Sequence, residues 1–333
     1  MLENKVIITA ALTGAVTRKE QNPATPYSPE EFGDVAAKCL AEGAAIVHIH
    51  VRNPETGAPT PNLEMIGATI KEIKAQAPEI IINLSTAIGV GVSVEDRLAP
   101  VIEFKPEMAS LNTNSMNFAT GDWSTGRVLQ EIIFENQFQN IVKYAKKMRE
   151  FQVRPEIEVY DFGGFYNIMF LQKNGYLMEP LHFQFVFGVL GGVPFTPMNF
   201  AHLLDLKPKD ATWSVCGVAK NQFQAAVAAI LQGGHIRVGL EDNIKNIKGE
   251  LAAGSNEQVA WTKQLVELCG LEVATPDEAR EILRIRGSKS WEALQKAAEK
   301  PAEKPAEAAS PAAPVKVAAK KKAAKKRAKK APK

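Results

Sequence analysis

The sequence predicts an α/β fold, a (β/α)8 TIM barrel, because short apolar strands alternate with amphipathic helices along most of the chain. The strand interiors are continuously apolar, which is typical of parallel strands covered by helices. Most of the predicted strands are followed by a helix-like segment. The strands are Val6–Leu12, Ala45–Val51, Ile80–Thr86, Met108–Asn112, Glu156–Tyr160, Phe183–Phe187, Trp213–Val218 and Ile236–Leu240.

The segments between the strands carry helix signals. Ser28 is expected to cap a helix with Pro29 in its first position and Glu31 three residues after the cap, as in a capping box. A doubly wound open sheet is the alternative fold, but Thr13-Gly14-Ala15 after the first strand is not the GxGxxG fingerprint of such sheets. Further helices are expected at about 62–75, 94–104, 139–151, 163–173 and 220–231.

The composition changes near Lys300, where a Lys-Pro-Ala-Glu unit repeats before the chain becomes rich in Ala and Lys. This stretch has no aromatic and almost no large apolar residues, so burial cannot offset the entropy of ordering it. We therefore expect a catalytic barrel domain over 1–289 and a disordered Lys/Ala/Pro-rich tail over 290–333. The net charge of +3 hides this division, because residues 316–333 carry +10 and leave −7 for the rest.

The remaining composition limits the cellular setting. Cys39, Cys216 and Cys269 are far apart and lack a CxxC spacing, which is typical of buried thiols in a reducing compartment. No apolar run approaches the ~20 residues of a membrane span. The N-terminus leads directly into a strand instead of a signal peptide. We expect a cytoplasmic protein without membrane contact.

Two histidines, His48 and His50, close the second predicted strand. Residues i and i+2 of a strand share one face, so both imidazoles are expected side by side at the strand end where barrels place their chemistry. On the last strand, Glu241 shares a face with Arg237 and is expected at the barrel mouth. Two histidines and a carboxylate with an open position are typical of catalytic zinc. The alternative is that Glu241 pairs with Arg237 while both histidines donate to backbone carbonyls.

Other polar side chains are expected at the same mouth. Arg237 and Asp242 are open to two interpretations. Either Asp242 is a base held in place by the cationic Arg237, or the two form an ordinary structural salt bridge. Thr13, which ends the first strand, is a candidate for substrate contact. Three further side chains either bind substrate oxygens or cap the helices that follow them, and these are Ser85, Ser110 and Asn112.

Two glutamates, Glu156 and Glu158, share one face of the fifth predicted strand. One of them orients a zinc-bound histidine or a water, or else they form buried ion pairs with Arg52 or Arg154. The other histidines are not expected to be ligands, because two begin their strands and one lies in a helix-like segment; they are His182, His235 and His202.

Six motifs, in this order, resemble the β-keto acid cleavage enzymes, a family that includes the 3-keto-5-aminohexanoate cleavage enzyme of lysine fermentation. The resemblance runs from about residue 4 to about residue 286 and leaves the tail outside. The motifs are Ala10–Ala15, His48–Arg52, Asn83–Thr86, Lys105–Asn112, Glu156–Tyr160 and Gly233–Asn243.

The resemblance implies a zinc-dependent barrel that condenses a β-keto acid with acetyl-CoA, giving acetoacetate and a new acyl-CoA by Claisen and retro-Claisen chemistry. It also implies a homo-oligomer, commonly a tetramer. The lysine-fermentation enzyme uses a glutamate for the substrate's ammonium group where this chain has Val16, so we expect a substrate side chain that is not cationic. By this resemblance, the family's zinc ligands correspond to His48, His50 and Glu241. Its catalytic pair corresponds to Arg237 and Asp242, and its substrate-contacting hydroxyls correspond to Ser85 and Ser110.

Two other functions are alternatives. A zinc hydrolase of the amidohydrolase type also uses a His-x-His strand, but it places the pair on strand one and needs histidines after strands five and six. A protein that binds polyanions through its Lys-rich tail would act by counterion release. Such binding would ignore sequence, because the tail has no aromatic side chain to stack on bases.

Overall fold

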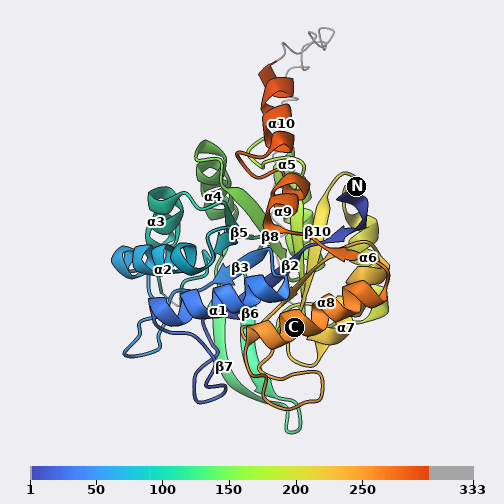
Figure 1. The fold of residues 1–333 in the computed structure, drawn as a ribbon. Coiled ribbons are helices and arrows are strands. Elements are labelled where there is room, and N and C mark those ends of the chain that lie inside the picture. Colours follow the sequence, from blue (N-terminus) through green and yellow to red (C-terminus); the bar gives the residue numbers. More distant parts are fainter. Residues whose placement is uncertain (1, 90, 300–333) are drawn as a thin grey trace, which may run out of the picture. The chain divides into compact units, whose positions relative to one another are not determined.

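The computed structural model describes residues 2–89 and 91–299, and its centre is a closed barrel of parallel strands (Figure 1). The chain passes around the barrel in sequence order, and the last strand pairs with the first. The predicted (β/α)8 barrel is therefore confirmed. Its strands are β2 (Ile8–Thr13), β3 (Ile46–Ile49), β4 (Ile81–Leu84), β5 (Met108–Asn112), β8 (Arg154–Val159), β9 (His182–Phe187), β10 (Thr212–Gly217) and β11 (His235–Val238).

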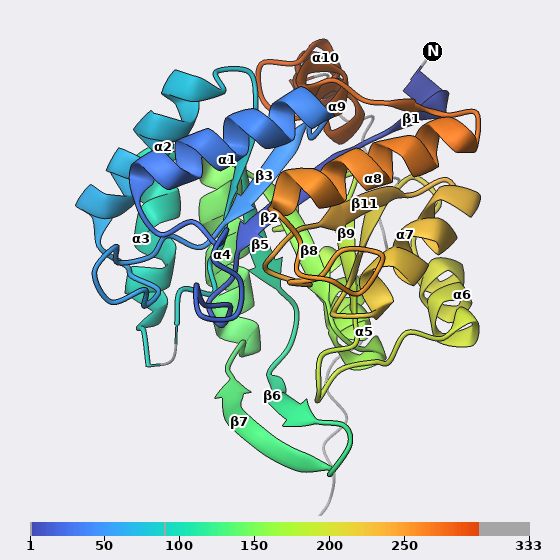
Figure 2. The same ribbon diagram turned by 60° about the horizontal axis from the view of Figure 1, so that its bottom comes forward.

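Helices surround the barrel (Figures 1 and 2). The predicted capping box is present at the first of them, where Ser28 and Glu31 exchange hydrogen bonds with each other's backbone. Four of the described helices, α6, α8, α9 and α10, were not among the predicted segments. The helices are α1 (Pro29–Glu42), α2 (Leu63–Gln76), α3 (Val94–Phe104), α4 (Phe138–Glu150), α5 (Phe162–Gln172), α6 (Pro197–Leu206), α7 (Asn221–Leu231), α8 (Ser255–Leu268), α9 (Pro276–Leu283) and α10 (Lys289–Glu299).

The two faces of the barrel strands differ in chemistry. Outward side chains such as Val47 and Leu84 are apolar and pack in one core with the helices. Inside the barrel, Ile46 and Met108 form a second apolar cluster with Leu283 of α9 near the N-terminal ends of the strands. The inward positions toward the C-terminal ends are polar. Folding energy thus comes from the outer core and the barrel base, which leaves the mouth free for polar groups.

A long hairpin between β5 and α4 was not predicted. Its strands β6 (Met116–Asp122) and β7 (Arg127–Phe134) pair antiparallel and extend away from the barrel (Figure 2). Most side chains of β7 are exposed and those of β6 are mostly half-buried, so neither strand shows the alternation of buried and exposed residues that could have marked it. A short parallel pair, β1 (Lys5–Val6) with β12 (Glu272–Val273), lies outside the barrel sheet.

The boundary of the predicted tail needs a correction. Residues 289–299 form α10, whereas we expected disorder from residue 290. Trp291 explains the difference, because its indole nitrogen donates to Gln152 Oε1 at 3.2 Å and its backbone N–H donates to Ser288. The rest of the predicted tail lies outside the described residues. Among the described helices, none combines the length and the apolar character that crossing a bilayer requires.

Candidate metal centre at the barrel mouth

His48 and His50 lie where the sequence predicted, at the C-terminal end of β3. His48 is the third residue of the strand and His50 follows its last residue, so both rings point the same way. Their centroids are 5.2 Å apart. The side chains are 1% and 7% exposed, respectively, so both imidazoles are removed from water.

Glu241 joins the two histidines from the turn that follows β11. Its Oε2 lies 3.8 Å from His48 Nε2, and its Oε1 lies 3.4 Å from His50 Nε2. The three ligand atoms lie within 4.8 Å of one another. Gly14 permits this approach, because a Cβ at that position would lie 2.7 Å from Glu241 Cγ. The structure thus brings together the three residues predicted as ligands.

The hydrogen bonding of this cluster fits a cation. Both nitrogens of His48, Nδ1 of His50 and Oε2 of Glu241 are buried without a hydrogen-bond partner. The alternative, in which both histidines donate to backbone carbonyls, is therefore wrong. Buried polar atoms normally find partners, and two imidazoles with one carboxylate form a donor set that zinc accepts with a position left open.

The charges around the cluster keep its side chains in ligand form. Burial lowers the pKa of His48 well below its usual value, so the imidazole is neutral and offers a lone pair. Burial by itself would raise the pKa of Glu241, but Arg237 and the two histidines outweigh it and hold that pKa far below its usual value.

Arg237 is the central cation of the mouth. It donates to Asp242 through Nε and Nη2, to Glu241 Oε1 at 2.7 Å and to Glu158 Oε1 at 3.2 Å. The predicted pairing of Glu241 with Arg237 and the predicted Arg–Asp pair are therefore both present. Burial raises the pKa of Asp242 despite Arg237, which moves this carboxyl toward the range of a general base. Burial also raises the pKa of Glu158 to about 8.

The candidate substrate contacts do not cap helices, since the side chain that caps α3 is Ser93. Ser85 Oγ accepts from the backbone of Ala87 at the mouth. Ser110 is fully buried and accepts from the Thr86 backbone, so its hydroxyl stabilises the neighbouring strand end. Both side-chain atoms of Asn112 are buried without a partner, which favours a role toward a ligand.

The two remaining candidate substrate contacts, Thr13 and Val16, lie at and just after the end of β2. The Thr13 hydroxyl is buried and accepts a 3.2 Å hydrogen bond from Arg52 Nη1. Val16 is 42% exposed at the rim. Arg52 itself binds backbone carbonyls of the mouth loops, and its guanidinium lies 4.9 Å from the centre of the Tyr27 ring. It forms no ion pair with a glutamate of the described residues.

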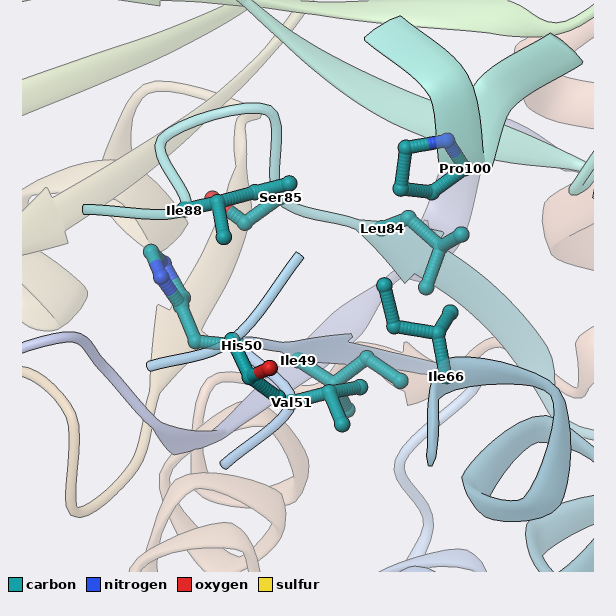
Figure 3. A pocket seen from close by; sticks show the side chains of 9 residues that line it. Ile49, His50, Val51, Ile66, Leu84, Ser85, Ile88 and Pro100 are labelled. Carbon is teal, nitrogen blue, oxygen red and sulfur yellow. The ribbon is translucent and has the colours of Figure 1, made fainter. Parts of the chain in front are cut away.

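An apolar recess opens beside the cluster (Figure 3). It lies between the outer faces of β3 and β4 and the helices α2 and α3, and its volume is about 20 Å³. His50 and Ser85 line its polar edge. The apolar walls are Ile49, Val51, Ile66, Leu84, Ile88 and Pro100.

Arg52 or Arg154 was expected as the ion-pair partner of Glu156 and Glu158, and the structure shows other partners. Glu158 pairs with Arg237, and Glu156 accepts from Asn83 Nδ2 at 2.7 Å. Arg154, the other expected partner, donates to the Pro180 carbonyl. Asn83 was not among the predicted site residues, although it shares inward parity with Ser85 on the same strand, and this parity was the signal that could have identified it.

The fold and the site define a class, that of parallel α/β-barrel enzymes with a candidate metal centre at the C-terminal ends of the strands. Residues 5–285 match the model of the beta-keto acid cleavage enzyme family. The chain belongs to this family, which confirms the resemblance drawn from its motifs and makes it an enzyme of carbon–carbon bond cleavage. The amidohydrolase alternative is thereby excluded.

This chain matches several relatives over nearly their whole length. It is 40% identical over 282 residues to the 3-keto-5-aminohexanoate cleavage enzyme of Fusobacterium nucleatum, covering 85% of this chain and 98% of that one. It is 36% identical over 303 residues to the 3,5-dioxohexanoate:acetyl-CoA acetone transferase of Paraburkholderia graminis, covering 86% and 97%. The ternary complex of ObcA with a C4-CoA adduct and oxalate shares the fold, with a TM-score of 0.65 at 19% identity over 79% of this chain and 68% of that one.

Proposed function

We propose that this protein is a zinc-dependent enzyme that condenses a β-keto acid with acetyl-CoA. The products are acetoacetate and the acyl-CoA of the original keto acid's side chain. The observation that carries the proposal is the buried cluster of His48, His50 and Glu241 beside the Arg237–Asp242 pair, in which both nitrogens of His48, Nδ1 of His50 and Oε2 of Glu241 lack hydrogen-bond partners. The relatives named above, which act on 3-oxo acids, one of them with acetyl-CoA, support the substrate class.

His48, His50 and Glu241 would hold the ion. A zinc ion bound there would supply Lewis-acid polarisation of the substrate's keto and carboxylate oxygens. Asp242 removes a proton from the carbon between these two groups as general base, and Arg237 keeps the carboxylate of Asp242 aligned. Asn112, whose side-chain amide is unpaired, and Ser85 would bind substrate oxygens.

The remaining steps balance without an enzyme nucleophile. The substrate carbanion attacks the thioester carbonyl of acetyl-CoA and releases the CoA thiolate. The thiolate then adds to the former keto carbon, and the bond from that carbon to the central carbon breaks. This step leaves the acyl-CoA and the acetoacetate carbanion, which regains its proton from Asp242. Burial raises the pKa of the Cys216 thiol, which agrees with a mechanism that needs no activated cysteine.

We infer that the side chain of the keto acid is neutral or apolar. Val16 stands at the rim where the resemblance places a glutamate that pairs with an ammonium group, and a valine offers no counter-charge. The recess beside His50 and Ser85 has apolar walls, which also favours an uncharged substituent (Figure 3). The uncharged 3,5-dioxohexanoate in the name of the Paraburkholderia relative belongs to this class.

We further propose a homo-oligomer, a tetramer as the resemblance implies. The hairpin supports this proposal, because several large apolar side chains are exposed on it and large exposed apolar surfaces mark interfaces. These side chains are Trp123, Val128, Leu129 and Ile133. Sedimentation equilibrium of the full chain is expected to give a particle of four 36.3 kDa subunits, and a monomer at all concentrations would contradict it.

Two expectations stay predictions. The cytoplasmic location is one of them. The polyanion contact of the Lys-rich segment is the other, since residues 300–333 lie outside the described part of the chain. Deletion of this segment is expected to abolish retention on a DNA column without loss of enzyme activity.

A substrate screen tests the proposed function. Purified protein is incubated with acetyl-CoA and a panel of β-keto acids whose side chains are neutral, cationic or anionic, and acetoacetate and acyl-CoA are measured. We expect equal amounts of both products from neutral keto acids. H48A serves as the matched inactive variant. Absence of acetoacetate from every keto acid would contradict the proposal.

A further inference from the structure

Glu156 is a buried carboxylate inside the barrel for which the reaction proposed above has no use. Its side chain is 1% exposed, and its Oε2 lies 3.7 Å from Nδ1 of His48. Asn83 Nδ2 donates a 2.7 Å hydrogen bond to the same oxygen. The imidazole of His48 therefore stands between two carboxylates, with Glu156 on its Nδ1 side and Glu241 on its Nε2 side.

Glu156 differs from its neighbour on the strand in having no cation at ion-pair distance among the described residues. Glu158 pairs with Arg237, whereas no lysine or arginine of the described residues lies within salt-bridge distance of Glu156. A buried carboxylate without a cation lowers the stability of the fold, and one hydrogen bond from an amide offsets only part of that cost. The fold alone therefore gives no reason for a carboxylate at this position.

The position of Glu156 is that of a group acting on a metal-bound histidine. A neutral imidazole carries one proton, and it can bind a cation through Nε2 only when that proton is on Nδ1. Ligand histidines usually donate this second N–H to a carboxylate or carbonyl, which fixes the ring and raises its basicity. The Nδ1 of His50 has no carboxylate beside it within the described residues, so the two candidate ligands are not equivalent.

We propose that Glu156 is the positioning residue of the metal centre, accepting the Nδ1 proton of His48 and so directing Nε2 to the cation, while Asn83 holds the carboxylate in place. The inference rests on the proposed metal-binding role of His48. The 3.7 Å distance exceeds a hydrogen bond, so the proposed contact requires a small rotation of one of the two side chains.

If Glu156 has this role, its replacement should change the zinc affinity and the stability of the fold in different directions. Replacement of Glu156 by glutamine removes an unpaired buried charge and keeps the shape, so the fold of chelator-treated protein should be at least as stable as the wild type. The same replacement removes the acceptor charge for His48, so zinc should bind more weakly. A residue that only supports the fold would change both quantities in the same direction.

The test compares E156Q with E158Q, because both variants change a buried carboxylate of β8 to an amide of equal size. Zinc affinity is measured by competition with a chromogenic chelator, and the melting temperature is measured after chelator treatment. For E156Q we expect about 10- to 100-fold weaker zinc binding with an unchanged or higher melting temperature. For E158Q we expect a lower melting temperature, because Arg237 loses a partner, and a smaller loss of zinc affinity than for E156Q, because Glu158 reaches the cluster only through Arg237.

A second variant covers the case in which E156Q does not fold. N83A leaves the charge in place but removes its hydrogen bond, and zinc binding is expected to weaken in the same direction. Wild-type zinc affinity in both E156Q and N83A would overturn the inference and leave the proposed function intact. A wild-type protein that binds no zinc would instead overturn the proposed function together with this inference.

Discussion

Arg237 donates two parallel hydrogen bonds to Asp242, from Nε to Oδ2 at 2.9 Å and from Nη2 to Oδ1 at 3.0 Å. Both side chains are buried, at 4% and 5% exposure. The paired bonds fix the plane of the carboxylate, while burial raises the pKa of Asp242 against the opposing effect of the guanidinium. A carboxyl group held in this way is aligned for proton transfer.

Replacement of Asp242 by asparagine is expected to abolish this transfer. D242N keeps the size and one hydrogen bond from Arg237, but it has no base, so kcat should fall by about 10²- to 10⁴-fold with KM little changed. Steady-state kinetics with the best keto acid of the panel measures this. R237K is the companion variant, since lysine keeps the charge without the paired bonds and should lower kcat by a smaller factor. Retention of most of the wild-type kcat in D242N would exclude Asp242 as the base.

Val16 is expected to set which charge the substrate side chain carries. V16E places a carboxylate at the rim, so kcat/KM for 3-keto-5-aminohexanoate should rise by about two- to fivefold, a modest factor because the position is partly exposed to solvent. V16Q is the control of equal shape and should not produce the gain. A wild-type enzyme that already prefers the amino substrate to uncharged keto acids would show that Val16 does not exclude a cation.

His235 makes the stability of the fold depend on pH. Burial lowers its pKa to about 4, and its neutral Nδ1 accepts a hydrogen bond from the Ile7 backbone. Between the folded value and the usual value of 6.5, the unfolded chain binds a proton that the folded chain does not. Stability therefore falls as the pH falls through this window, by at most about 3 kcal/mol from this residue.

The measurement for this prediction is the free energy of unfolding from urea titrations at about pH 7, above the window set by linkage, and at about pH 4.5, near its lower end. H235N keeps an acceptor near the Ile7 amide but does not titrate, so it should lose less stability on acidification than the wild type. His182, whose pKa burial also lowers, contributes a remaining slope of the same sign. An identical pH dependence in both proteins would show that His235 is not the titrating group.

The sequence was sufficient for the barrel because burial on the strands leaves a strong pattern. Segments such as Ala45–Val51 are buried throughout and apolar apart from His48 and His50, since helices cover them outside and the barrel encloses them inside. The β6–β7 hairpin could not be found in this way, because β7 is mostly exposed and β6 is mostly half-buried, so neither strand carries a continuous buried pattern. The start of the tail was misplaced because α10 gains order from single contacts such as that of Trp291 with Gln152, which composition does not reveal.

The positions of the site residues were predictable where the alternation of side chains along a strand determined them. Strand parity placed the two histidines on one face and aligned Glu241 with Arg237. The partners of Glu156 were not predictable, because its contact with Asn83 spans β4 and β8 across the barrel interior and depends on barrel geometry. The burial of Ser110 behind the Thr86 backbone depends on the same geometry.

The central claim is that His48, His50 and Glu241 bind one catalytic metal ion per chain. Elemental analysis of untagged protein tests it most directly, combined with acetoacetate formation before and after chelation. We predict about one zinc per chain, loss of activity with the metal, recovery on adding zinc, and no bound zinc in an H48A/E241A variant that still folds. Protein without any transition metal, whose activity is the same after chelation as after zinc addition, would contradict the account.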